Sequence, residues 1–220
     1  MRLATPGLIV CGLTAWSALA LAQTIGNPVP EIDDGQLALG LSLESFARDL
    51  SFENGGSDSV EYSRMGFRAD YGLSKNRALQ IFFGQTTVDP GPGGNWSGAE
   101  LGAGYRQPVD ITLPIAGKEA PTAVFGDIRY GNLEDGAAFS YLQYEFGYGG
   151  SYPARKDLDI YAAVLYSDVY GRISSKNVSA VDNLGFLGGV EFSAAKNLRL
   201  TGELHLLHEW GLGLMLLLYL

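Results

Sequence analysis

Two histidines near the end of the chain are the residues whose types and spacing come closest to a catalytic set. His205 follows Glu203 by two positions, and His208 directly precedes Glu209. Because imidazole titrates near neutral pH, a histidine beside a carboxylate can transfer protons in general acid–base catalysis. The spacing positions no serine or aspartate as a partner, so we assign no catalytic residue. An enzyme that acts on lipid or peptide at an extracellular rim, through His208 and Glu209, stays an alternative hypothesis.

Motifs for a metal ion, a phosphate group or a lipid anchor are incomplete. His205 and His208 are three positions apart and would face opposite sides of a strand, so we predict no metal site and no cofactor. The Gly-Pro-Gly-Gly loop at 91–94 lacks the lysine of a phosphate-binding loop. Cys11 follows Val10, which is too large for the cleavage site of a lipoprotein.

The charge of the chain excludes one class of partner. The 220 residues include 15 Lys and Arg against 24 Asp and Glu, and the formal net charge is -9. A protein neutralises nucleic-acid phosphates with clustered Lys and Arg, which this chain lacks. We therefore predict no nucleic-acid partner.

The start of the chain has the three parts of a secretory signal. Arg2 supplies a positive charge, an apolar stretch covers about residues 8–21, and an Ala-Leu-Ala cleavage motif ends at Ala22. The stretch is shorter than the roughly 20 residues that a membrane-spanning helix needs. We predict a signal peptide at 1–22, cleaved near Ala22, and a short periplasmic segment at 23–34.

The rest of the chain alternates apolar and polar residues in stretches separated by Gly, Asn, Asp, Ser and Pro. Residues 36–44, for example, carry leucine at every second position, and residues 63–73 repeat the pattern. Successive side chains of a strand point to opposite faces, so each stretch meets two environments. Stretches of about 9–12 residues suffice for tilted strands that cross a bilayer. We predict an all-β, closed, antiparallel up-and-down transmembrane β-barrel over 35–220, with about ten strands and eight as the alternative.

The polar face decides between this barrel and a soluble sandwich. It combines glycine with charges of both signs and has few lysines, which suits a narrow lumen where arginines and carboxylates pair. We expect the following residues to form this polar network in the lumen: Arg64, Arg68, Asp70, Glu100, Arg106, Asp127, Arg129, Glu145, Asp159, Glu191, Arg199, Glu203 and His205.

Aromatic residues recur near the ends of the expected strands. Amphipathic rings favour the two membrane interfaces, so these residues are expected to form two girdles. The inner girdle would contain Tyr71, Tyr105, Tyr148 and Phe192, and the outer girdle Tyr62, Trp96, Tyr130, Tyr166 and Trp210. Scattered core aromatics are the alternative interpretation, since strands favour aromatic residues anyway.

Turn signals order the strands. Lys-Asn pairs at 75–76 and 196–197 precede apolar stretches and predict tight periplasmic turns, because Asn tolerates positive φ. Segments rich in Gly, Asp and Asn predict longer outer loops at 49–59, 89–95, 132–136 and 167–182. Two connections fit poorly: 108–121 is long for a periplasmic turn, and 207–210 contains no Gly, Asn or Pro.

Taken together, these features resemble the small outer-membrane β-barrel proteins of Gram-negative bacteria. The resemblance covers about residues 35–220 and rests on the signal peptide, the alternation and the hairpin from Gly72 to Asn76. It implies an outer-membrane location, contact with outer-membrane lipid and a barrel-assembly machinery as partner during biogenesis. Such barrels usually end in an aromatic residue, whereas here Tyr219 stands one place before the end.

The function that we predict is a porin-like, monomeric barrel of the cell envelope with a structural, binding or narrow-transport role. About ten strands leave a lumen largely filled by side chains, so we predict no general diffusion channel. A soluble periplasmic barrel that binds a small ligand is a further alternative, and it requires a polar exterior. The sequence identifies no ligand or substrate.

Overall fold

The computed structural model describes residues 24–53, 55–89, 95–134, 139–173 and 176–220. The predicted signal peptide lies outside these residues. The described part is built of strands: β1 (Leu37–Phe52), β2 (Ser57–Ser74), β3 (Arg77–Asp89), β4 (Trp96–Ile115), β5 (Lys118–Glu134), β6 (Phe139–Arg155), β7 (Leu158–Ile173), β8 (Lys176–Ala180), β9 (Leu184–Ala195), β10 (Leu198–Leu206) and β11 (Trp210–Tyr219). No helix among the described residues is long and apolar enough to cross a bilayer.

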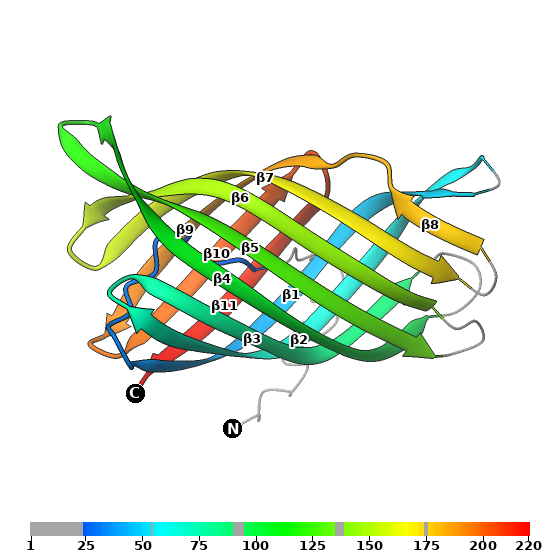
Figure 1. Ribbon diagram of the computed structural model, residues 1–220, viewed down its shortest axis with the longest axis horizontal. Helices are drawn as coiled ribbons and strands as arrows, with labels where there is room; N and C mark the ends of the chain where they lie inside the picture. Colours follow the sequence, from blue (N-terminus) through cyan, green and yellow to red (C-terminus); the bar gives the residue numbers. More distant parts are fainter. Residues whose placement is uncertain (1–23, 54, 90–94, 135–138, 174–175) are drawn as a thin grey trace, which may run out of the picture.

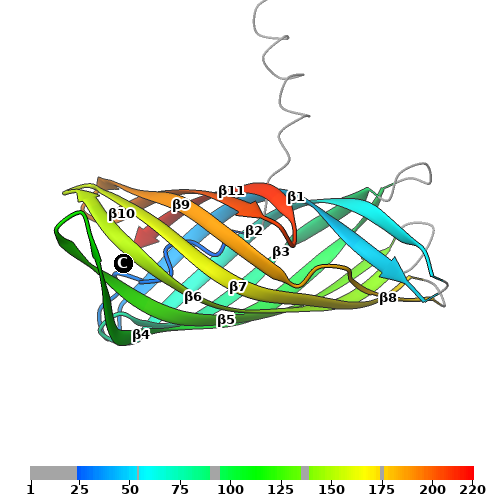
Figure 2. The ribbon, with the colours of Figure 1, turned by 90° about the horizontal axis from the view of Figure 1, so that it is seen from above.

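The strands form a closed antiparallel barrel (Figures 1 and 2). Each of β1–β7 pairs with the next strand in sequence, β7 pairs with β9, and the β9–β10–β11 meander returns to β1. The closing pair runs from Ala38 opposite Tyr219 to Ala47 opposite Trp210. Among the described residues, ten strands close the barrel, and the short β8 is an additional strand. The predicted up-and-down barrel of about ten strands is confirmed.

The strand β8 narrows one end of the barrel. It pairs with β7 at Tyr170–Ile173 and with β1 at Leu50–Phe52. The next strand, β9, pairs with the first part of β7, from Leu158 to Tyr166. The β10–β11 hairpin lies between β9 and the first part of β1, and it ends partway along the wall. The barrel thus changes from ten strands to eight, with β8 at the narrow end (Figure 1).

The connections define the two ends. Four two-residue turns lie at what we call the turn end, at 75–76, 116–117, 156–157 and 196–197, and the opposite end is the loop end. The Lys75-Asn76 turn is confirmed, with Asn76 at a φ of 60°.

Two expectations about connections were wrong, and a segment that fitted poorly as a turn consists of strand. Residues 108–121 are not a long turn, because β4 and β5 continue as a paired hairpin to the two-residue turn at 116–117. The predicted loops at 49–59 and 167–182 consist largely of strand, since their backbone groups keep pairing with neighbouring strands despite a polar composition.

The two faces of the wall differ as a membrane barrel requires. On β1, Leu39, Leu41 and Leu43 are exposed, while Glu44 and Arg48 are buried in the interior. The same alternation recurs on the other long strands, so the exterior is a broad apolar belt. The polar exterior that a soluble periplasmic barrel needs is not observed.

This alternation inverts near the loop end. There the outward positions are charged and exposed, at Asp49, Glu61, Asp89, Glu134 and Arg172. The inward positions at the same height are apolar and form one buried cluster: Phe46, Leu50, Val60, Tyr62, Val88, Leu133, Phe139, Tyr141, Val169 and Val178. The loop end is therefore built like a soluble barrel, and the apolar belt ends below it.

Two residues of the predicted outer girdle face inward. Tyr62 shares its face of β2 with Arg64, is buried, and stacks on Phe46 with ring centroids 4.8 Å apart. Trp96 packs against Phe139 at 6.0 Å within the loop-end cluster. Both positions follow from strand parity, because they lie an even number of residues from inward charges.

The other predicted girdle residues lie on the outer face. Six of them are exposed and one, Tyr148, is half-buried: Tyr71, Tyr105, Tyr130, Tyr148, Tyr166, Phe192 and Trp210.

The segment that precedes β1 lies inside the barrel. Residues 24–32 run through the turn-end half of the lumen, and the chain reverses at 33–36 to enter β1 (Figures 1 and 2). Ile25 and Ile32 are almost fully buried. We predicted a periplasmic location for this segment, and its residues carry no sequence signal for entering the lumen.

Candidate functional site

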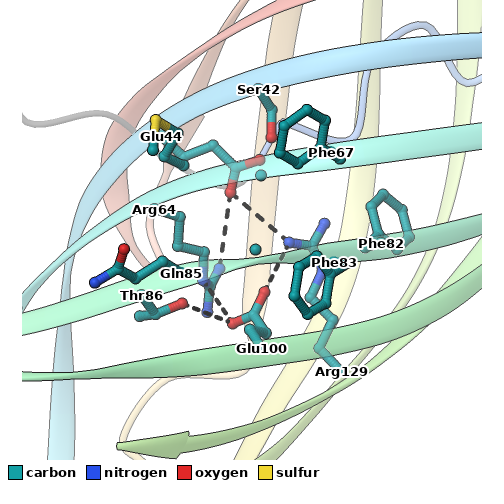
Figure 3. Close-up of a pocket in the computed structure, with 13 residues that line it drawn as sticks. Ser42, Glu44, Arg64, Phe67, Phe82, Phe83, Gln85, Thr86, Glu100 and Arg129 are labelled. Atoms are coloured by element: carbon teal, nitrogen blue, oxygen red, sulfur yellow. Dashed lines mark hydrogen bonds and ion pairs between the residues drawn. The ribbon is translucent and has the colours of Figure 1, made fainter.

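The lumen is the place where the fold gathers polar side chains, and two carboxyl and two guanidino side chains meet at its centre (Figure 3). Glu44, Arg64, Glu100 and Arg129 come from β1, β2, β4 and β5 and are all buried. Arg64 Nε lies 2.8 Å from Glu100 Oε2, and Arg129 Nη1 lies 3.2 Å from Glu100 Oε1. Glu44 Oε2 lies 3.9 Å from Arg64 and 3.8 Å from Arg129. We call these four residues the central quartet.

Neighbouring side chains complete the quartet. Tyr141 and Thr86 donate hydrogen bonds to Glu100 Oε2. The guanidinium carbon of Arg129 lies 4.2 Å from the ring centroid of Phe82, a cation–π distance. The cavity beside the quartet measures about 10 Å³, which is the space of a single water. Two carboxylates and two guanidiniums therefore neutralise each other in a filled interior, as expected for buried charges that must be paired.

A second polar group holds the N-terminal segment in place. The two carboxylate oxygens of Glu203 accept the backbone N–H groups of Ile25 and Gly26, at 2.7 and 2.8 Å. Arg68 donates to the carbonyl of Ile25 at 2.7 Å, and Arg106 donates to the carbonyls of Ile25 and Asn27. The barrel thus satisfies backbone groups that would otherwise be buried without partners.

The segment requires glycine at one position. Gly26 has a φ of 77°, a left-handed conformation that non-glycine residues rarely adopt. A Cβ atom built there would lie 2.7 Å from Met215 Cε. Asn27 then anchors the next residue by donating from Nδ2 to Ser151 Oγ at 3.0 Å. The segment is therefore fitted to the lumen by shape as well as by hydrogen bonds.

Most of the expected lumen residues are buried. Eleven of the thirteen are at most 6% exposed: Arg64, Arg68, Asp70, Glu100, Arg106, Asp127, Arg129, Glu145, Glu191, Glu203 and His205. Asp159 and Arg199 are half-buried near the turn end, where Arg199 pairs with Glu31 at 2.8 Å. The list leaves out Glu44, Arg48 and Ser167, which are also buried in the lumen. Alternation with the exposed leucines of β1 would have found Glu44 and Arg48, and strand parity with Asp159 on β7 would have found Ser167.

The rim location of His208 and Glu209 was wrong. Both are buried, in the turn between β10 and β11 that ends partway along the wall. The expectation that His205 and His208 face opposite sides was also wrong, because His208 lies in this turn and not on a strand. Glu209 Oε2 lies 4.0 Å from Arg48 Nη1, inside the barrel. An enzyme that acts at an exposed rim through these residues is not supported by this arrangement.

Comparisons with known proteins identify no family. No family model and no curated protein matches the chain. Among solved structures, the toluene transporter TodX of Pseudomonas putida is similar at 8% identity, with 92% of this chain and 94% of that chain covered and a TM-score of 0.29.

Two further structures match at lower scores. A porin variant of Rhodopseudomonas blastica is 8% identical over 84% of this chain and 100% of that chain, with a TM-score of 0.18. The copper transporter OprC is 13% identical over 80% of this chain and 37% of that chain, also at a TM-score of 0.18. We base the membrane assignment on the faces of the barrel itself.

Proposed function

We propose that this chain is an integral outer-membrane β-barrel with a sealed lumen and a structural or binding role in the cell envelope. The observation that carries the proposal is the arrangement of its faces. Apolar side chains cover the exterior while paired charges fill the interior, which is the reverse of a soluble protein. Only a surrounding apolar solvent makes that arrangement favourable, and a barrel satisfies its backbone hydrogen bonds there because it has no free edge.

The inversion near the loop end supports an orientation. Charged outward residues such as Glu61 and Glu134 are costly in hydrocarbon and favourable in water, so the loop end projects beyond the lipid. In outer-membrane barrels the short turns face the periplasm. We therefore place the turn end in the periplasm and the narrow, eight-stranded end outside the cell.

Three layers seal the lumen in this proposal. The N-terminal segment occupies the turn end, the central quartet fills the middle, and the apolar cluster around Phe46 and Phe139 fills the narrow end. An eight-stranded barrel has an interior just wide enough for side chains. Transport would require both the segment and the apolar layer to move, so a structural or binding role fits the geometry better than a diffusion channel.

Two measurements test this proposal. Cell fractionation followed by gel electrophoresis with and without boiling should show the protein in the outer-membrane fraction, with a migration that changes on heating. Recovery in the soluble periplasmic fraction would contradict the membrane assignment. Planar-bilayer recording of the folded protein should show no large, stable conductance, and steps of the size that open porins produce would contradict the sealed lumen.

A further inference from the structure

The turn between β10 and β11 gathers three residues that can ligate a metal ion. His205 is the inward residue at the end of β10, and His208 and Glu209 follow in the turn. All three are nearly inaccessible to solvent. The turn lies where the wall changes from ten strands to eight, so the hairpin has no continuing strand above it. We call His205, His208 and Glu209 the turn cluster.

The donor atoms of the turn cluster are as close as the ligands of one ion. His205 Nδ1 lies 2.9 Å and His208 Nε2 lies 3.4 Å from Glu209 Oε1. One ligand atom from each of the three residues falls within 4.8 Å of the others. In a tetrahedral zinc site with bonds near 2.0–2.2 Å, ligand atoms are separated by about 3.3–3.5 Å. The two distances to Glu209 Oε1 already lie within a few tenths of an ångström of that separation, and rotation of the two histidine side chains would bring all three ligand atoms around one ion.

These atoms also lack other partners within the described part of the chain. Apart from the contacts within the cluster and the 4.0 Å approach of Arg48 to Glu209, no hydrogen-bond partner lies near either nitrogen of His208, Nδ1 of His205 or the carboxylate oxygens of Glu209. A buried polar atom without a partner costs about 1–3 kcal/mol. A shared cation would satisfy several of them at once, and metal coordination is one of the ways in which proteins accommodate buried charges.

A carboxylate behind the cluster fixes one of its rings. Glu203 Oε1 lies 2.6 Å from His205 Nε2, on the side of the ring opposite Glu209. Glu203 is itself held, because Oε2 accepts the hydroxyl of Tyr161 at 2.8 Å. Metal-ligating histidines usually donate their second N–H to such a carboxylate, which orients the ring and raises its basicity.

The charges of the surroundings favour a cation. Arg48 lies 4.0 Å from Glu209 Oε2, but it also donates to Ser167 Oγ and to the Ser167 carbonyl, both at 2.9 Å. Ser167 in turn donates to Glu145. Two carboxylates therefore flank the His205 ring, Glu203 at Nε2 and Glu209 at Nδ1, and both lie within 3 Å of a ring nitrogen. Oε1 of Glu209, on the side away from Arg48, is the oxygen that faces both histidines.

We propose that His205, His208 and Glu209 bind one divalent transition-metal ion inside the barrel wall, with Glu203 as the residue that orients His205. Two imidazoles and one carboxylate suit Zn²⁺ and its first-row neighbours. The ion pins the tip of the short β10–β11 hairpin to the lumen at the step in strand number. Three protein ligands leave one coordination position for water or a small ligand.

The test is metal binding by the tag-free protein purified from membranes in detergent. After treatment with a chelator and its removal, equilibrium dialysis against Zn²⁺ with elemental analysis should find one ion per barrel. Co²⁺ in its place should give the intense visible absorption of a four-coordinate site. The readout is ion binding in detergent, so it is independent of whether the barrel conducts.

Variants assign the ion to the cluster. H208A and E209Q should each abolish stoichiometric binding, and E203Q should weaken it by about 10–100-fold, as loss of an orienting carboxylate does. The matched control is E191Q, which removes another buried lumen carboxylate from β9 and should bind the ion like the unaltered chain.

Two results would overturn the proposal. One is an unaltered barrel that migrates as folded on the gel and yet binds no Zn²⁺ at stoichiometric concentration. The other is equal binding by the unaltered chain, H208A and E209Q. If a variant does not fold, the Co²⁺ spectrum of the unaltered protein decides, because a six-coordinate or absent spectrum contradicts ligation by the turn cluster.

Discussion

Replacing Glu100 by glutamine tests whether the central quartet is truly removed from water. The carboxylate accepts Arg64 at 2.8 Å and Arg129 at 3.2 Å, and all three side chains are buried. At an effective dielectric constant of about 20, a charge pair at 2.8 Å attracts by about 6 kcal/mol before desolvation is counted. Without the Glu100 charge, the two guanidiniums share the carboxylate of Glu44 at 3.8–3.9 Å.

The expected loss of unfolding free energy is about 3–5 kcal/mol, the range for breaking a buried ion pair on one side. Denaturant unfolding of the barrel in lipid vesicles, followed by tryptophan fluorescence, measures it. The matched control is E61Q, an exposed charge on β2, which should change the unfolding free energy by less than about 0.5 kcal/mol.

A double variant checks the physical cause. Removing Arg129 together with the Glu100 charge, as in R129M with E100Q, takes away one charge of each sign. The loss should then be smaller than the sum of the two single effects, with a coupling of about 0.5–3 kcal/mol. If E100Q and E61Q lose the same small amount, the quartet is hydrated and the sealed lumen is refuted.

Three further predictions concern the segment, its glycine and the outer face. Deleting residues 24–33 removes the backbone partners of Glu203 and should lower the denaturant concentration at the unfolding midpoint. Planar-bilayer recordings of this variant should still show no conductance, because the apolar cluster at the loop end remains. Conductance steps would show that this cluster does not close the lumen. G26A should lower the unfolding free energy more than G35A in the same assay. Both glycines have a positive φ, but only at Gly26 would an added Cβ meet another side chain, that of Met215. Equal losses would exclude this clash. F67K places a charge in the apolar belt and should cost about 2–4 kcal/mol in vesicles. E61K, on the same face of β2 beyond the belt, should cost little, and equal costs would contradict the proposed membrane boundary.

Most of the correct predictions came from the alternation of apolar and polar residues along the strands. The leucines of β1 and the charges at Arg64, Arg68 and Glu100 fall on the faces expected, because a membrane wall separates two environments throughout its height. The tight turn at Asn76 was predictable from a residue that tolerates positive φ.

Parity was misread where the environments change. Near the loop end the interior is apolar, so Tyr62 and Trp96 look like membrane-facing aromatics although they lie on the inward face. Residue type alone therefore assigns these two aromatics to the wrong face. Counting positions along the strand from Arg64 or Glu100 assigns them correctly to the inward face.

The contacts between residues far apart in the sequence could not be predicted from local sequence patterns. The turn at Leu207, with a φ of 80°, has none of the usual turn residues, and β8 is recognisable only from its pairing with β1 and β7. Residues 24–32 enter the lumen because Glu203, Arg68 and Arg106 accept and donate there, and those residues are far away in sequence. The turn cluster was missed for another reason: residues 207–209 carry no turn signal, so His208 was assigned to a strand and to the face opposite His205.

The two tryptophans of the described barrel allow the most direct test of its orientation. Trp210 is exposed on the outer face and Trp96 lies inside. In vesicles whose acyl chains carry bromine, W96F should show strong fluorescence quenching, because its remaining Trp210 contacts lipid. W210F, which keeps Trp96, should be quenched little. Strong quenching of W210F together with weak quenching of W96F would mean that the apolar face is turned inward, and would contradict the account.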